Sequence, residues 1–181
     1  DRKCKIYLLH GSLTDADMHA FYRHPKIKAA VSTTHGEGFG LPLFEAAYSG
    51  LPIIAPEWSG HLDFLFMEVV DKKTGKQKKK AMFAAVDYDM APIPKEAVWE
   101  GVLQEDSQWC YPKQGSFKMR LREVKKDYGR FLKQAKQLKK ELNKNMSPEI
   151  QYEKFTTPIK SLFPDNDSWM GEIEDIVKSY E

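Results

Sequence analysis

The sequence has few cysteines, no long apolar run and almost no net charge. Its two cysteines, Cys4 and Cys110, have neither the number nor the spacing of a disulfide framework or a metal site. We interpret them as reduced thiols of a cytoplasmic protein; a disulfide between them is the alternative. No apolar run approaches the ~20 residues that a membrane-spanning helix needs, and the first residues lack the pattern of a signal peptide. The net charge of +2 argues against a dedicated nucleic-acid-binding protein.

The sequence does contain enough apolar material for a folded domain. Apolar residues make up 41% and aromatic residues 12% of its 181 positions, which suffices for a sizeable core. We therefore predict a single domain over residues 1–181. Positive charge gathers in Lys72–Lys80 and between Lys118 and Lys144, whereas Asp165–Glu181 is acidic. The lysines of Lys72–Lys80 fit a solvated hairpin tip, and the alternative is peripheral contact with an anionic membrane or a polyanionic acceptor.

Short apolar runs alternate with helical patterns in the first third of the chain. Thr14 is a good N-cap for a helix that ends before Pro25, and Gly50 is placed to stop a helix that has Pro42 near its start. This alternation predicts an α/β fold, a parallel sheet with helices on both faces. The predicted strands are Ile6–His10, Ile27–Thr33 and Pro52–Pro56, and the predicted helices are Thr14–Tyr22, Leu41–Tyr48 and a helical turn at His61–Phe66.

The remaining two thirds of the chain have a different pattern. Two apolar runs flank the polar stretch KKTGKQKKK, which predicts a β-hairpin with a lysine-rich tip. A stretch with two prolines follows, and then apolar residues recur at helical spacing, so that the C-terminal third is predicted to be largely helical. The predicted elements are hairpin strands at Phe66–Val70 and Ala81–Val86, an irregular segment at Met90–Trp109, helices from Ser116 to Asn145 with a break near Gly129, and helix starts at Ser147 and after Ser168.

The stretch HGEGFGLPLFEAAYSG, residues 35–50, is the densest candidate for a functional site. Gly36, Gly38 and Gly40 would raise the entropy cost of ordering a core element, whereas a loop that admits a ligand to its backbone can use them. The stretch follows a predicted strand and opens a predicted helix, at a sheet edge where a helix N-terminus suits a phosphate. Glu37 belongs to the loop and Glu45 to the first helical turn, so that both can face one cleft. Two carboxylates would repel a phosphate group, so their place beside a phosphate site needs another explanation. They can accept hydrogen bonds from hydroxyl groups, and a sugar provides such groups.

These residues resemble those of a known family. EGFGLPLFE is similar to the E-x7-E signature of retaining glycosyltransferases of the GT-B fold, particularly family 4. The flanking stretches EAAYSGLPIIAPEWSG and HGSLTDADMHAFY resemble that family in order, and Trp109–Pro112 resembles its W-x-x-P. The resemblance is strong over residues 5–66, looser over 105–145 and absent from 67–104, which we interpret as an insertion. It implies the Rossmann-like C-terminal lobe of such an enzyme, with a β-hairpin insertion and a helical C-terminal third.

The resemblance also implies a nucleotide diphosphate sugar as the donor substrate. In the full-length enzyme the hexose would be transferred, with retention of configuration, to an unknown glycan, lipid or protein acceptor. The family needs no metal or other cofactor, because cationic side chains and the helix end stabilise the departing diphosphate. The acceptor-binding N-terminal lobe and the family's cationic pair for the diphosphate are not found in this sequence. We therefore expect this chain alone to bind the donor weakly and to transfer no sugar.

The same resemblance assigns roles to individual residues. Glu37 would be the catalytic residue that faces the transferred sugar, and Glu45 would accept the ribose hydroxyls. The donor sugar and diphosphate would be contacted by Gly36, Gly38, Phe39, Gly40, Leu41 and Pro42. The nucleobase region would contain His10, Gly11 and Ser12, and the wall of the site would include His35 and His61.

Simpler explanations exist for each feature. The glycine stretch can be a tight strand–helix connection without a ligand, and Glu37 can be an exposed loop glutamate. His35 can be a proton donor or a side chain that hydrogen-bonds the loop, and His61 a site wall or part of a structural turn. The other functions left open are a GT-B epimerase or phosphorylase, a non-catalytic nucleotide-sugar-binding scaffold, and nucleic-acid binding through the lysines. A phosphorylase would need a lysine that carries pyridoxal phosphate, and no supporting context for one is found.

Overall fold

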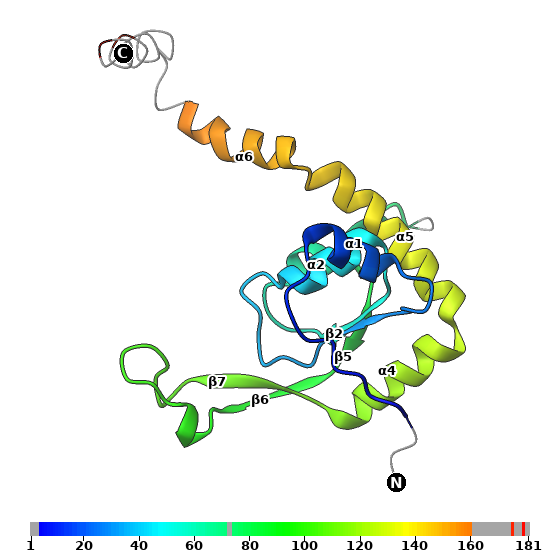
Figure 1. Ribbon diagram of the computed structural model, residues 1–181, viewed down its shortest axis with the longest axis vertical. Helices are drawn as coiled ribbons and strands as arrows, with labels where there is room; N and C mark the ends of the chain where they lie inside the picture. Colours follow the sequence, from blue (N-terminus) through cyan, green and yellow to red (C-terminus); the bar gives the residue numbers. More distant parts are fainter. Residues whose placement is uncertain (1–3, 72–73, 161–174, 176–178, 180–181) are drawn as a thin grey trace. The chain divides into compact units, whose positions relative to one another are not determined.

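The computed structural model describes residues 4–71, 74–160, 175 and 179. The chain packs as two compact units, residues 1–140 and 141–181. Figure 1 shows the elements of each unit. In chain order they are α1 (Asp15–Arg23), β1 (Ala30–Val31), α2 (Leu41–Ser49), β2 (Ile53–Pro56), α3 (Leu62–Leu65), β3 (Phe66–Val70), β4 (Gln77–Ala81), β5 (Ala84–Val86), β6 (Tyr88–Pro92), the 3₁₀-helix Lys95–Ala97, β7 (Gln108–Pro112), α4 (Gln114–Lys126), α5 (Tyr128–Asn145) and α6 (Pro148–Lys160).

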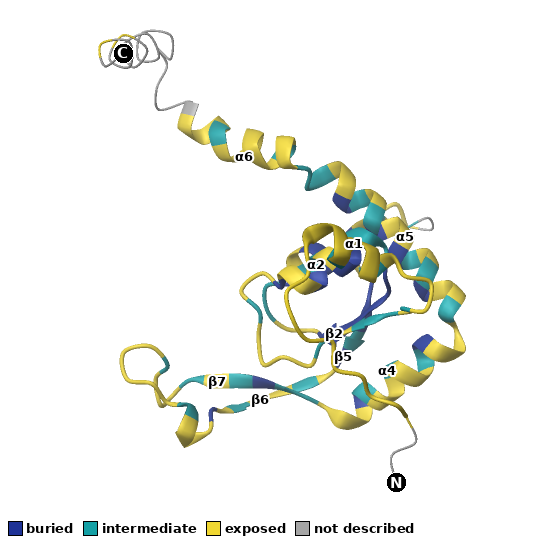
Figure 2. Ribbon diagram, viewed as in Figure 1, coloured by how far each residue is buried: buried dark blue, intermediate teal, exposed yellow. Residues whose placement is uncertain are grey.

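The first unit is built around a three-stranded parallel sheet in the order β1-β2-β5. In its register Ala30 lies opposite Ile53, and Ile54 lies opposite Ala84. Every residue of β2 is buried, and because successive side chains of a strand point to opposite faces, both faces of the sheet are covered there. α2 and α4 both contact β2, and Figure 2 shows the buried residues around this strand. The predicted α/β fold with a parallel sheet is confirmed.

Capping residues set the ends of α1 and α2. The Asp17 N–H donates to the Thr14 hydroxyl (3.2 Å) and the Thr14 N–H donates to the Asp17 carboxylate (3.2 Å), which is a capping box. α2 lies between Gly40 and Gly50, whose φ angles of 87° and 89° belong to the left-handed region that favours glycine. Both helices therefore form where the sequence predicts them.

The predicted strand Ile6–His10 is not formed. These residues pair with no strand in the part of the chain that the structure describes, and Leu8 is 88% exposed. Of the predicted strand Ile27–Thr33, only the two residues of β1 are in the sheet. A strand needs neighbours to pair its backbone and bury its side chains, but among the described residues β1 pairs only with β2. The prediction was wrong because a local apolar pattern does not show whether a partner strand is available.

β3 and β4 form the predicted antiparallel hairpin, but its second arm is β4 rather than Ala81–Val86. The lysines at 78–80 therefore lie in a strand and not at the tip. Glu68 lies opposite Lys79, and opposite charges in this arrangement favour the pairing. The last three residues of the predicted arm become β5, because a small apolar strand can be buried beside β2. Contact of these lysines with an anionic surface stays a prediction.

The segment Met90–Trp109 was predicted to be irregular, but it contains half of the residues of an antiparallel ribbon formed by β6 and β7 (Figure 1). In this ribbon Met90 lies opposite Cys110. Pro92 and Pro112 are the last residues of their strands, where a missing N–H is tolerated. The prediction was wrong because proline excludes the middle of a strand and not its end.

α4 and α5 account for the helical pattern predicted from Ser116 onward. Val124 and Phe131 are buried together with side chains of β2 and β5, so these helices complete the core of the first unit. The break between the two helices falls at Asp127, whose φ of −122° and ψ of 50° are not helical. Gly129, the predicted break, lies inside α5.

The second unit contains the end of α5 and the whole of α6. The Gln151 N–H donates to the Ser147 carbonyl (3.0 Å), so α6 starts where the sequence predicts it. Most of its described side chains are exposed, Tyr152 and Phe155 among them. The helix predicted after Ser168 lies outside the described residues. Within the described part of the chain, no helix combines the length and the apolar character that crossing a bilayer requires.

Candidate functional site

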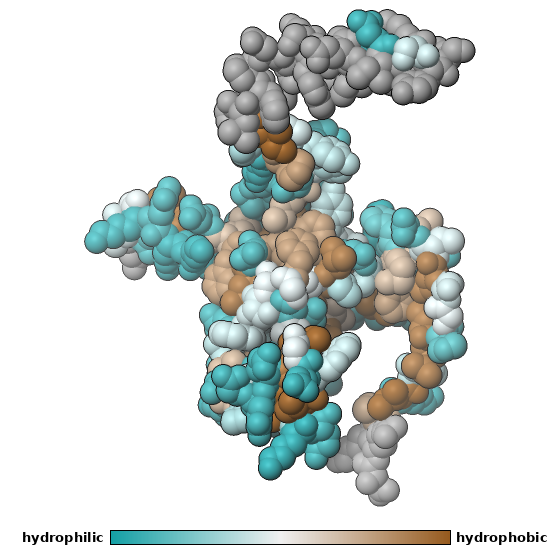
Figure 3. Space-filling view, turned by 90° about the vertical axis from the view of Figure 1, so that its left-hand side faces the viewer, coloured by the Kyte–Doolittle hydropathy of each residue, from teal (hydrophilic) through white to brown (hydrophobic). Residues whose placement is uncertain are grey.

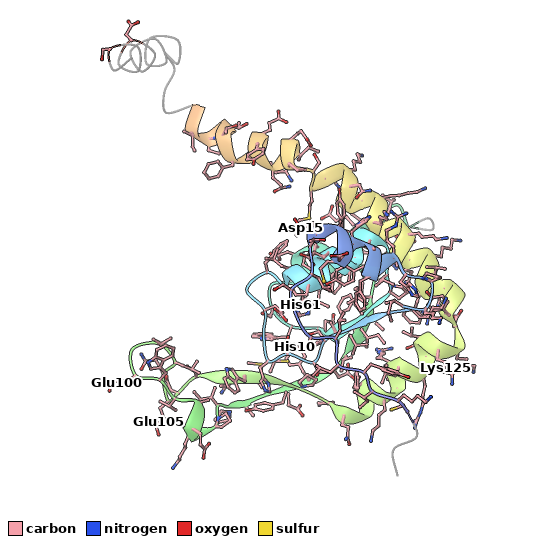
Figure 4. The ribbon with its side chains drawn as sticks, viewed as in Figure 1. His10, Asp15, His61, Glu100, Glu105 and Lys125 are labelled. Carbon is pink, nitrogen blue, oxygen red and sulfur yellow. The ribbon has the colours of Figure 1, made fainter. Side chains whose placement is uncertain are left out.

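Two loops meet at the carboxyl edge of the parallel sheet. The glycine loop, residues 35–40, follows β1 and leads into α2, and the second loop, residues 57–61, follows β2 and leads to α3. Because β1 and β2 are parallel, their carboxyl ends lie at the same edge, which is where open α/β sheets bind ligands. His61, labelled in Figure 4, ends the second loop. We take these two loops together as the candidate site.

Ser59 ties the two loops together at Glu37. Its hydroxyl donates to the Glu37 carbonyl (2.6 Å) and accepts from the Glu37 N–H (2.8 Å). The Gly60 N–H donates to the same carbonyl (3.0 Å). Ser59 has a φ of 87° and is the only non-glycine residue with a positive φ in the described part of the chain. This conformation costs about 1 kcal/mol or more, and such strain is concentrated at functional sites. The strained Ser59 therefore marks these loops as a candidate binding site.

The close approach of the loops requires glycine at two positions. A Cβ atom on Gly60 would lie 1.9 Å from the Gly38 carbonyl oxygen, and one on Gly40 would lie 3.1 Å from the His61 Cβ. Gly40 also has a φ of 87°. Gly38 differs, because a Cβ atom there would meet nothing within 4 Å. Packing thus explains Gly40 and Gly60, whereas the open space beside Gly38 is available to a ligand.

The N-terminus of α2 follows the glycine loop and has no side-chain cap. Helix N-termini carry unpaired N–H groups and a partial positive charge, which favour an anion. Pro42 lies in the first turn, where its missing N–H costs no hydrogen bond. Phe39 rests on the rings of Phe44 and Phe64, at centroid distances of 5.4 and 5.1 Å, and Leu41 is exposed. This end of the helix can therefore accept a phosphate group.

The two glutamates of the motif have different surroundings. Glu37 is half-buried in the glycine loop, and Glu45 is exposed on α2. Glu45 is the fifth residue of α2 and not part of its first turn, which corrects the prediction. It lines a cavity of about 190 Å³ together with Tyr22 of α1, and Glu37 is not among the lining residues. A cleft shared by both carboxylates stays a prediction.

Tyr22 is a neighbour of Glu45 that the sequence did not indicate. Burial raises the pKa of the Tyr22 phenol, and the Glu45 carboxylate raises that pKa further by its charge and by accepting a hydrogen bond from the phenol. The phenol and the carboxylate both line the same cavity. Tyr22 is therefore in a position to orient Glu45.

His61 is buried, with 1% of its surface exposed. Its Nε2 lies 2.7 Å from the Pro56 carbonyl oxygen. A carbonyl only accepts, so Nε2 carries a hydrogen and donates it to Pro56. The His61 Nδ1 has no partner among the described residues. His61 therefore holds the second loop to the end of β2, which favours the structural-turn interpretation over an open site wall.

His35 is attached to β7. Its Nδ1 donates to the Cys110 carbonyl (2.7 Å), and the Cys110 N–H donates to the His35 carbonyl (3.3 Å). The His35 ring stacks on Trp109 at 4.8 Å and meets Tyr111 edge-on at the same distance. The ribbon thus supports the glycine loop, and a hydrogen-bonding role for His35 accounts for these contacts.

The two cysteines differ in accessibility, which gives a first prediction. Both are free, so the alternative disulfide is not formed; Cys4 is exposed and Cys110 is buried. Burial raises the pKa of the Cys110 thiol, and the thiolate is the reactive form. Iodoacetamide is expected to alkylate Cys4 in the folded protein and Cys110 only after unfolding, as measured by peptide mass spectrometry. Equal labelling of both thiols in the folded protein would contradict the buried position of Cys110 in β7.

The remaining predicted site residues lie in exposed backbone. His10, Gly11 and Ser12 belong to the exposed segment before α1, and none of them lines the cavity beside Glu45. Gly36 is exposed in the glycine loop. Nucleobase contact in this region stays a prediction.

Sequence reasoning missed Ser59 and Gly60 as a unit. The signal for them was the WSGH stretch directly after a buried strand, because every strand of a parallel sheet ends at the ligand-binding edge. Within the described part of the chain, no group of three or more His, Cys, Asp or Glu side chains forms a metal site. Comparison with family models, curated proteins and solved structures gives no match for this chain.

Proposed function

We propose that this chain is the donor-binding lobe of a retaining glycosyltransferase of the GT-B type. Its ligand would be a nucleotide diphosphate sugar, and the intact enzyme would transfer the hexose to an acceptor with retention of configuration. One observation carries the proposal. A glycine loop at the carboxyl edge of a parallel sheet is pinned by Ser59 and Gly60 and leads into the uncapped N-terminus of α2.

In this proposal the diphosphate lies at the N-terminus of α2, beside Gly38. Backbone N–H groups and the helix end stabilise negative charge on the departing diphosphate without needing to reorganise. Glu37 faces the transferred sugar from the loop. Glu45 lies further along α2, about 6 Å from the helix start at 1.5 Å per residue, where it accepts hydrogen bonds from the ribose. Donor recognition is thus divided between the glycine loop, which meets the sugar, and the first turns of α2, which meet the diphosphate and the ribose.

Ligand-dependent thermal stability tests this proposal. The chain is heated with UDP, GDP, ADP and the corresponding glucose derivatives, and with uridine, guanosine and adenosine as controls without a diphosphate. A ligand at 100 times its Kd stabilises by about 2.7 kcal/mol, which raises Tm by roughly 5–10 °C in a chain of this size. We expect this shift for one nucleotide diphosphate and its sugar, and none for the nucleoside. Absence of a shift with every diphosphate would overturn the proposal.

A further inference from the structure

A groove lies where α3 meets the hairpin of β3 and β4, and we call it the hairpin groove. It has a volume of about 490 Å³, within the range of roughly 300–1,000 Å³ that is typical of ligand-binding clefts. In Figure 3 the hairpin projects at the left of the view, and its surface is mostly hydrophilic. The lining residues come from α3 and both strands and are Leu62, Asp63, Phe66, Met67, Glu68 and Lys79.

The apolar part of the lining is held in place by packing. Met67 is buried, and Phe66 is half-buried. The Phe66 ring meets the Phe83 ring edge-on at a centroid distance of 5.7 Å, so its position does not depend on a ligand. The groove therefore offers a fixed apolar surface beside its polar groups, and the C–H face of a sugar ring can pack on such a surface.

The polar part of the lining carries charges of both signs. Asp63, Glu68 and Lys79 are exposed, and among the described residues their side chains form no ion pair or hydrogen bond. The ion pair of the hairpin joins Lys78 to Asp71 instead (3.6 Å). Two carboxylates disfavour a phosphate or sulfate group, and the ammonium group disfavours a cation. Carboxylates accept hydrogen bonds and the ammonium group donates them, so together they match neutral hydroxyl groups, which do both.

The hairpin groove is attached to the second loop of the candidate site. The Leu62 N–H donates to the Ser59 carbonyl (3.1 Å), and the Asp63 N–H donates to the Gly60 carbonyl (3.2 Å). Ser59 and Gly60 are the residues that pin the glycine loop at Glu37. A ligand in the groove would therefore lie next to the loops that are proposed to hold the donor.

We propose that the hairpin groove binds a neutral carbohydrate chain, the acceptor of the proposed sugar transfer. Asp63 and Glu68 accept hydrogen bonds from its hydroxyl groups, Lys79 donates to its oxygen atoms, and a sugar ring packs on Phe66. Sugar units away from the reacting hydroxyl occupy the groove. The role as acceptor rests on the proposed function, and it favours a glycan over a lipid, whose apolar chain offers no partner to the three charged groups.

Saturation-transfer difference NMR with neutral trisaccharides tests the groove in the absence of any nucleotide. The panel is maltotriose, cellotriose, chitotriose and mannotriose, and we expect the chain to bind at least one of them. Asp63→Ala and Glu68→Ala are each expected to weaken that binding by about tenfold or more, because each removes a hydrogen bond to a charged group. Both side chains are exposed, so the fold is expected to survive, and circular dichroism checks this.

Two control variants match these changes. Glu105→Ala removes an exposed carboxylate between β6 and β7, away from the hairpin. Lys78→Met removes a lysine of β4 that does not line the groove, whereas Lys79→Met removes its neighbour that does. We expect Glu105→Ala and Lys78→Met to bind the trisaccharide as the unchanged chain does, and Lys79→Met to bind it more weakly.

Absence of binding to every neutral trisaccharide would overturn the inference. So would binding that Asp63→Ala and Glu68→Ala leave unchanged, or binding of a sulfated trisaccharide alone, which would point to the other lysines of β4. Nucleotide diphosphates that raise Tm without any carbohydrate binding would overturn the groove and leave the donor site standing. Carbohydrate binding without any effect of nucleotides on Tm would support the groove and overturn the donor site.

Discussion

Replacing Gly60 by alanine is expected to lower the free energy of unfolding by about 3 kcal/mol. The new Cβ atom would lie 1.9 Å from the Gly38 carbonyl oxygen, so one of the two loops must move. Forced overpacking typically costs 1–3 kcal/mol, and the upper end applies because the obstacle is backbone and not a flexible side chain. The displacement also endangers the hydrogen bond from the Gly60 N–H to the Glu37 carbonyl. In a chain of this size the expected fall in Tm is roughly 6–12 °C.

Gly129→Ala is the matched control for this change. Gly129 is the second residue of α5, and a Cβ atom there would meet nothing within 4 Å. Alanine in a helix is more stable than glycine by about 0.5–1 kcal/mol, so this variant is expected to gain stability. Urea denaturation of both variants beside the unchanged chain measures the two effects. Gly60→Ala with unchanged stability would show that the two loops do not approach as closely as the structure has them.

The same pair of variants connects stability to ligand binding. Because Gly60 and Ser59 hold the glycine loop in place, Gly60→Ala is expected to lose nucleotide diphosphate binding below its own Tm. Gly129→Ala is expected to bind as the unchanged chain does. Retained binding by a folded Gly60→Ala variant would show that the pinned loop is not required for the ligand.

The elements that sequence reasoning predicted correctly are those that local signals determine. Thr14 starts α1 through bonds to a residue three positions away, and Gly50 ends α2 through its own left-handed backbone. The buried β2 was identified from an unbroken apolar run. None of these features depends on residues that are distant in the sequence.

The errors concern strand pairing, which is not local. Ile6–His10 has the composition of a strand but pairs with no strand among the described residues. The second arm of the hairpin is the lysine-rich β4, in which Lys79 lies opposite Glu68 of β3. Both outcomes depend on which other segment is available. Periodicity within a segment carries no information on that point.

The candidate site, too, has features that local sequence signals predict and features that depend on residues distant in the sequence. The glycine loop and its position before α2 follow from the spacing of glycines and Pro42. The pinning of Glu37 by Ser59 and the meeting of Tyr22 with Glu45 in one cavity join residues 22 or more positions apart, and neither partner could be identified from a local pattern. His35 is a similar case, because its Nδ1 partner is the carbonyl of Cys110 on the ribbon.

Glu45→Gln is expected to weaken a nucleoside diphosphate and its sugar derivative alike, by about ten- to a hundredfold. The ribose is common to both ligands, and losing a hydrogen bond to a charged group costs about 1.5–3 kcal/mol. Glu37→Gln is expected to leave the diphosphate nearly unchanged and to reduce only the extra affinity that the sugar provides. Titration calorimetry of both variants with both ligands measures the difference. Tyr22→Phe should show a smaller loss than Glu45→Gln, because it removes only a partner of the Glu45 carboxylate.

Glu105→Gln is the control for charge alone, because Glu105 is an exposed carboxylate outside both site loops (Figure 4). It removes the same charge and is expected to change neither affinity. If Glu37→Gln weakens the bare diphosphate as much as Glu45→Gln does, the assignment of sugar to the loop and ribose to the helix is wrong. If neither variant changes either affinity while the unchanged chain binds, the ligand lies elsewhere. The glycine loop then serves only as the pinned connection between β1 and α2, because Gly40 and Gly60 are required by packing in either case.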